Sequence, residues 1–85
     1  MGRQRASQRA RQSKGYRTEL RRFGLLVRTH RLALQLTLEQ AAERMDLDVT
    51  HLTKIEGGTI NVTFATIVCI ARGLEMSVPE LLIDP

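Results

Sequence analysis

The segment from Val49 to Glu56 carries side chains that could make polar contacts from one face of a short helix. The apolar Leu52 and Ile55 are expected to face inward. The outward positions are then Val49, Thr50, Thr53 and Lys54, with His51 at the flank. Threonine and lysine can hydrogen-bond the edges of DNA bases, and valine can pack on a thymine methyl group. The chemistry of this face therefore suits contact with a DNA duplex.

The residue pattern does not indicate a catalytic site or a metal site. His30, His51 and Cys69 lack the spacing of a metal site. Cys69 lies in an apolar helical stripe, where a buried thiol is the favoured interpretation, and no base stands near it to activate it. The acids Glu39 and Glu43 belong to a solvated helix face. We expect a protein that is not an enzyme, with no metal, no cofactor and no small-molecule substrate.

Hydrophobic periodicity and capping residues predict five helices and no strand. Leu20, Phe23 and Val27 recur with helical spacing and predict a first helix that starts near Arg17 or earlier and ends near Ala33. The other helices are expected over residues 38–45, 49–56, 64–72 and 78–83. The sequence therefore predicts an all-α, five-helix bundle.

Cap and turn residues set these boundaries. Thr37 and Gln40 form a capping box at the start of the second helix. Asp48 is expected to cap the third helix through its carboxylate. Asp46 is expected in the turn before it, in a left-handed conformation that aspartate tolerates. Gly73 is expected to end the fourth helix.

The helices over residues 38–45 and 49–56 are joined by a turn of three residues. Two short helices joined in this way can cross at a steep angle, which makes a helix-turn-helix. The bend allows the first helix to lie against the DNA backbone while the second enters the major groove. A single straight helix could not do both, so the break in the helical pattern itself indicates DNA binding.

Charge is distributed unevenly along the chain. Residues 1–22 contain eight basic residues and one acidic residue, a net charge of +7, whereas residues 23–85 contain five basic and eight acidic residues, a net charge of −3. Seven of the eight N-terminal bases are arginines, whose guanidinium groups match phosphate. We expect residues 1–16 to be a basic N-terminal arm, either a DNA-contacting segment or a disordered tail. Residues 17–85 are expected to form the helix-turn-helix DNA-binding domain.

The cellular location is predicted from the absence of disulfide, membrane-helix and signal-peptide patterns. One cysteine cannot form an internal disulfide and fits a reducing cytosol. No apolar run approaches the roughly 18 residues of a membrane helix, and the polar N-terminus does not resemble a signal peptide. The arm also lacks the apolar face of an interfacial helix. The prediction is a cytoplasmic protein without a membrane partner.

From Phe23 to Leu82 the sequence resembles the lambda-repressor-like (Cro/repressor, XRE) helix-turn-helix family. The resemblance is carried, in order, by FGLLVRTHR, TLEQAAERMDLDVTHLTKIEGG and NVTFATIVCIARGLEMSVPELL. Within that family, DVTHLTKIE followed by NVTFATIVCIARGLEMS is similar to the controller proteins of restriction–modification systems. Plasmid, phage and antitoxin-type regulators share the same core.

The resemblance implies roles for individual residues. The base-contacting positions match Val49, Thr50, Thr53 and Lys54. A structural ion pair between the first helix and the end of the recognition helix matches Arg31 and Glu56. Positions near a phosphate match Thr37, Gln40, Thr59 and Asn61. The two-fold dimer interface is expected at Val78, Leu81, Leu82 and Ile83.

Further contacts with the DNA backbone are expected outside these matched positions. His51, at the flank of the recognition helix, is one of them. The others are arginines of the basic segment, namely Arg3, Arg5, Arg9, Arg11 and Arg17.

Two functions remain open at the level of sequence. The first is a sequence-specific transcriptional regulator that binds double-stranded DNA as a homodimer, on a palindromic or pseudopalindromic operator with half-sites roughly 34 Å apart. The second is an antitoxin-type or other protein-interaction module with secondary DNA binding. The N-terminal extension is basic rather than apolar, which favours the first.

Overall fold

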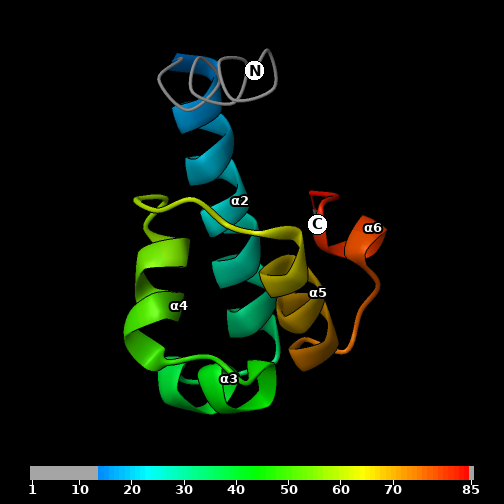
Figure 1. Ribbon diagram of the computed structural model, residues 1–85. Coiled ribbons are helices and arrows are strands. Elements are labelled where there is room, and N and C mark those ends of the chain that lie inside the picture. The colour runs from blue at the N-terminus through cyan, green and yellow to red at the C-terminus, as the bar shows by residue number, and fades with distance from the viewer. Residues whose placement is uncertain (1–13, 85) are drawn as a thin grey trace.

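The structure is a computed structural model that describes residues 14–84. Over this range the chain is all-α, as predicted, with no strand. The helices are α2 (Lys14–Ala33), α3 (Leu38–Met45), α4 (Val49–Glu56), α5 (Phe64–Gly73) and α6 (Val78–Leu81). Figure 1 shows α2 as the long central helix, with α3 beneath it, α4 on one side, and α5 and α6 on the other.

The observed helix boundaries agree closely with the predicted ones. Helices α3 and α4 have the predicted bounds, α5 is one residue longer, and α6 ends two residues earlier. Helix α2 begins at Lys14, so the last three residues of the expected arm are helical. The remainder of that arm lies outside the described residues. None of the helices between residues 14 and 84 has the length and hydrophobicity needed to cross a membrane.

Each helix contributes an apolar face to one core. The residues that are at most 2% exposed include Val27, Met45, Leu52, Ile55, Ile70, Leu74 and Leu81. Helix α6 reaches this core because it packs on both α5 and α2. Leu81 is fully buried there, at 0% exposure, so its expected place in a dimer interface was wrong. A side chain that fills the core of one protomer cannot also contact a second copy.

Two glycines allow helices to approach more closely than a larger residue would permit. A Cβ on Gly24 of α2 would lie 2.5 Å from the carbonyl oxygens of both Ile55 and Glu56, so α4 packs directly on the backbone of α2. A Cβ on Gly73 would lie 2.6 Å from Cγ of Met45. Gly73 is the last residue of α5, where it brings α5 against α3. The helix ends at this glycine, close to the predicted end at residue 72, and the positive φ that follows falls at Glu75.

A buried ion pair joins α2 to the end of α4. The Arg31 guanidinium donates from Nε to Oε2 of Glu56 at 2.7 Å and from Nη2 to Oε1 at 3.0 Å. Its Nη1 donates to the carbonyl oxygen of Leu36 at 2.8 Å, which adds the α2–α3 loop to the same cluster. The two side chains are only 9% and 8% exposed. The hydrogen bonds that Arg31 donates to the Glu56 carboxylate raise the pKa of Arg31, against the opposing effect of burial.

We predict that Gly24→Ala destabilises the fold by about 1–3 kcal/mol, because the added methyl group would overlap two carbonyl oxygens of α4. The matched control is Gly15→Ala in the same helix. A Cβ at Gly15 has nothing within 4 Å, so that substitution should be neutral or slightly stabilising. Urea unfolding followed by circular dichroism measures both. Equal unfolding midpoints for the two variants would contradict the close α2–α4 approach.

We predict that Glu56→Ala destabilises the fold by about 3–5 kcal/mol, because it leaves the buried Arg31 charge unpaired. The control is Arg44→Ala, which removes an ion pair with Glu75 whose side chains are 45% and 72% exposed. That change should cost less than about 1 kcal/mol. The same unfolding experiment compares the two, and similar losses would argue against the structural role of the buried pair.

Candidate nucleic-acid interface

Helices α3 and α4 and the turn between them form the predicted helix-turn-helix. Asp46 adopts the predicted left-handed conformation, with φ 57° and ψ 42°, and its N–H bonds back to α3. The Leu47 N–H donates to the carbonyl oxygen of Ala42 at 2.9 Å, which closes the turn. Ala41 and Ala42 are buried beneath it. The two helices are therefore held at a fixed angle by hydrogen bonds and by small residues at their junction.

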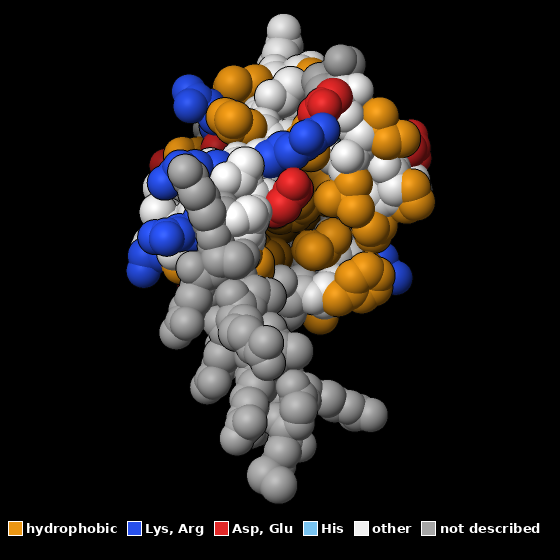
Figure 2. Space-filling view, turned by 90° about the horizontal axis from the view of Figure 1, so that it is seen from above, with side chains coloured by type: hydrophobic (Ala, Val, Ile, Leu, Met, Phe, Trp, Pro, Cys, Tyr) orange, Lys and Arg blue, Asp and Glu red, His pale blue; other side chains and the backbone are white. Residues whose placement is uncertain are grey.

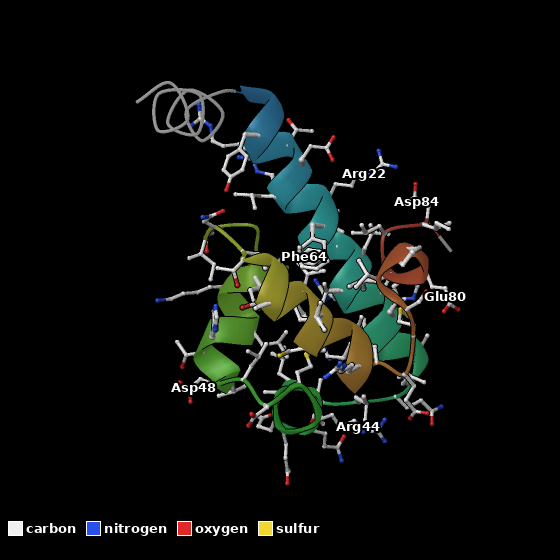
Figure 3. All side chains as sticks on the ribbon, turned by 45° about the vertical axis from the view of Figure 1, so that its right-hand side comes forward. Arg22, Arg44, Asp48, Phe64, Glu80 and Asp84 are labelled. Carbon is white, nitrogen blue, oxygen red and sulfur yellow. The ribbon has the colours of Figure 1, made fainter. Side chains whose placement is uncertain are left out.

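The start of α4 differs from the prediction in one detail. Asp48 has the extended backbone of an N-cap residue, but its carboxylate makes no capping hydrogen bond. The expected side-chain cap was therefore wrong. Figure 3 shows the side chain of Asp48 directed outward from the corner of the molecule. Because the first turn of α4 is exposed, water can solvate both the carboxylate and the amides of that turn.

The four residues predicted to read bases are all exposed on α4, and Leu52 and Ile55 are buried beneath them. The Thr53 hydroxyl donates to the carbonyl oxygen of Val49 at 2.8 Å. Its proton is thereby engaged within the helix, and its lone pairs remain available to a donor such as a base amino group. The α4 face thus offers Val49 as an apolar contact, Thr53 as an acceptor and Lys54 as a donor.

The predicted backbone-contacting residues at the start of α3 form a complete capping box. Thr37 Oγ1 accepts from the Gln40 amide at 3.1 Å, and Gln40 Oε1 accepts from the Thr37 amide at 2.9 Å. Both side chains use their acceptor atoms in these bonds. The Thr37 hydroxyl and the Gln40 amide group can still donate outward, beside the positive end of the α3 dipole. Donors of this kind match the oxygens of a phosphate.

The remaining predicted backbone contacts lie in different surroundings. Thr59 donates through Oγ1 to the carbonyl oxygen of Lys54 at 3.2 Å and so closes the end of α4. Asn61 accepts a hydrogen bond from the Tyr16 hydroxyl. Arg17 and Asn61 line one groove between α2 and the loop over residues 57–61, whereas His51 is half-buried on α4. The predicted contacts at Arg3, Arg5, Arg9 and Arg11 lie outside the described residues.

Apolar side chains gather away from the α4 face. Leu82 and Ile83 are 49% and 63% exposed after α6, and Val78 packs against the core. Phe64, at the first turn of α5, is 69% exposed. Helix α5 has hydrophobic residues on more than one face, and only one face of a helix can pack on the core, so some of these residues have to be exposed. Figure 3 shows Phe64 near the middle of the view, at the start of α5 and between α4 and α6.

In Figure 2 most basic side chains lie on the left, the side where α4 lies in Figure 1, and most hydrophobic side chains lie on the right, the side of α6, although some of each kind lie elsewhere. Within residues 14–84 there is no group of three or more histidine, cysteine, aspartate or glutamate side chains that could hold a metal ion. The described part of the chain therefore has a polar, partly basic face and an apolar face, separated by the core.

Comparisons with known proteins agree with this arrangement. Residues 22–82 match the model of a family described as a helix-turn-helix domain. The control protein C.SmaI of Serratia marcescens is 39% identical over 56 residues, which are 66% of this chain and 67% of that protein.

Comparison with solved structures also finds controller proteins. The restriction–modification controller protein C.AhdI of Aeromonas hydrophila is 31% identical, with a TM-score of 0.73, over 75% of this chain and 97% of the other. The wild-type controller protein C.Esp1396I is 30% identical, with a TM-score of 0.69, over 74% of this chain and 85% of the other. The chain therefore belongs to the helix-turn-helix domain family, in which it is similar to the controller proteins of restriction–modification systems.

Proposed function

We propose that this protein is a sequence-specific DNA-binding transcriptional regulator that acts as a homodimer, in the manner of a restriction–modification controller. The observation that carries the proposal is the exposed face of α4, at Val49, Thr50, Thr53 and Lys54, on a helix whose opposite face is fixed in the core. A helix anchored along one face and free along the other can enter a major groove without disturbing the fold.

In the proposed complex, α3 and α4 have different tasks. The donors of Thr37 and Gln40 at the start of α3 bind a phosphate and set the position of the protein on the duplex. Helix α4 then enters the major groove with its N-terminal residues first. There Thr50 and Lys54 contact base edges, and Val49 can cover a thymine methyl group.

We base the homodimer on three exposed hydrophobic side chains, Phe64, Leu82 and Ile83, which we propose form one apolar face. Large exposed hydrophobic side chains are costly in a monomer and are typical of interaction surfaces. A two-fold dimer through this face would direct the two α4 helices outward, toward half-sites about one helical turn apart. The same apolar face could instead bind a different protein, as in an antitoxin, and the oligomeric state distinguishes these two functions.

We predict that Thr50→Ala or Lys54→Ala costs about 1–3 kcal/mol of binding free energy on an operator selected from random duplex DNA. Binding to a scrambled duplex should change much less, because base readout contributes little there. Thr29→Ala, at an exposed site on α2, is the matched control and should bind both duplexes like the unmodified protein. Fluorescence anisotropy measures the affinities. Equal losses on both duplexes would show that these side chains do not read bases.

We predict that Ile83→Glu shifts the protein from dimer to monomer, because it places a charge in the proposed apolar interface. Leu32→Glu is the control, since Leu32 is 51% exposed on α2, outside that interface, and should leave the dimer intact. Sedimentation equilibrium gives the mass of each variant. A monomeric unmodified protein, or a dimeric Ile83→Glu variant, would contradict the proposed homodimer.

A further inference from the structure

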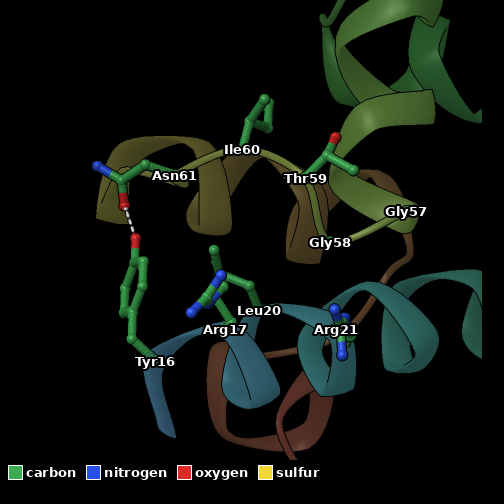
Figure 4. A pocket seen from close by; sticks show the side chains of 9 residues that line it. All are labelled: Tyr16, Arg17, Leu20, Arg21, Gly57, Gly58, Thr59, Ile60 and Asn61. Carbon is green, nitrogen blue, oxygen red and sulfur yellow. Dashed lines mark hydrogen bonds between the residues drawn. The ribbon is translucent and has the colours of Figure 1, made fainter. Parts of the chain in front are cut away.

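An open groove lies between the N-terminal half of α2 and the loop that follows α4 (Figure 4). Its volume is about 600 Å³. Arg17 and Arg21 lie on the α2 wall, and Thr59 and Asn61 lie on the loop wall. None of the described residues that line it is acidic. The family match begins at residue 22, so the α2 wall precedes the segment shared with the family.

The two walls of the groove are in direct contact at its base. Gly58 has φ +68°, and a Cβ there would lie 2.7 Å from Cα of Arg21 and 2.9 Å from its N. The loop backbone therefore lies on the backbone of α2 at this point. Arg17 stands one helical turn before Arg21 on the same face. The groove is thus a fixed feature of the fold, with its arginines on a helix and not on a loop.

The arginines of the groove are available to a ligand. Among residues 14–84 the ion pairs use Arg22, Arg31 and Arg44, and neither Arg17 nor Arg21 has an acidic partner there. Both side chains are exposed. Guanidinium groups bind phosphate oxygens with paired, charge-assisted hydrogen bonds, which gives these two positions a clear preference for an anion.

The loop wall adds a polar side chain, Asn61, at the edge of the same groove. The Tyr16 hydroxyl donates to Oδ1 of Asn61. Figure 4 shows this bond holding the carbonyl side of the Asn61 amide toward Tyr16, with the amide nitrogen on the other side. The Asn61 nitrogen can therefore donate to a ligand while its oxygen is already satisfied. An anionic oxygen in the groove would meet the arginine donors of the α2 wall.

We propose that this groove binds a backbone phosphate of the DNA, beyond the bases contacted by α4, with Arg17 and Arg21 as its ligands. This inference rests on the proposed function. The loop wall continues directly from Gly57, the C-cap of α4, so the groove lies next to the end of the recognition helix. A helix lying in the major groove has a phosphodiester strand at its flank, and the first turns of α2 extend the contact along that strand.

The test uses the double variant Arg17→Ala/Arg21→Ala in the full-length chain. Its affinity for a random-sequence duplex is measured by fluorescence anisotropy over a series of sodium chloride concentrations. Each phosphate contact contributes a slope of about −0.9 to the plot of log affinity against log salt. The double variant should therefore lose about one to two units of that slope. A slope equal to that of the unmodified protein overturns the proposal.

Two further variants make the result specific to the groove. Arg72→Ala removes a positive charge from an exposed site on α5, away from the groove, and should keep the original slope. Arg17→Lys/Arg21→Lys keeps both charges and should recover most of the slope. If Arg72→Ala reduces the slope by as much per charge as the groove variant does, the effect is one of net charge and the groove is not a phosphate site. Circular dichroism spectra confirm that each variant is folded.

Failure of this inference can be distinguished from failure of the proposed function. If the unmodified protein binds its selected operator and Thr50→Ala reduces that binding, the regulator function stands. An unchanged salt slope in the groove variant then rejects only the phosphate site. If the unmodified protein binds no duplex at low salt, the proposed function and this inference both fail.

Discussion

The contact between α2 and the end of α4 determines how the α4 face is presented. At Gly24 the two helices touch through backbone atoms, and the Arg31–Glu56 pair lies beside this contact with both side chains nearly buried. Arg31 also holds the loop before α3 through Leu36. Removing either partner would leave a charge in the interior, so the cluster allows only one arrangement. Its position at the C-terminal end of α4 leaves the N-terminal end of that helix free.

The C-terminal segment divides its side chains between two tasks. Leu81 is fully buried and fixes α6 to the core, whereas Leu82 and Ile83, the next two residues, are exposed. Arg22 and Asp84 face one another in Figure 3 and form an ion pair at 2.9 Å, which joins this segment to α2. That pair is exposed and contributes little energy. The C-terminal segment is therefore attached to the rest of the protein mainly through the burial of Leu81. The core that supports α4 thus also holds the proposed dimer face in place.

Local signals explain why α3 and α4 could be predicted to the residue. The Thr37–Gln40 capping box and the left-handed Asp46 act within a few residues of sequence, and both occur in the structure. One error was local, since the Asp48 carboxylate makes no capping hydrogen bond, and the other errors concern contacts between distant segments. A glycine at a helix end does not reveal whether it is also a site of close approach, and only the position of Met45 shows that Gly73 has this second role. A helix as short as α6 has too few residues to reveal which of Leu81 and Leu82 faces inward.

The distribution of charge suggests how affinity and specificity are divided under the proposed function. Residues 23–85 have a net charge of −3, so this part of the chain alone would gain no overall electrostatic attraction to DNA. Residues 1–22 have a net charge of +7 and include the two arginines of the α2 groove. When basic residues bind phosphates, counterions are released from the DNA, and the resulting gain in affinity does not depend on the DNA sequence. The N-terminal segment would therefore supply most of the salt-dependent affinity, while α4 needs only a few uncharged contacts and Lys54 to discriminate between sites.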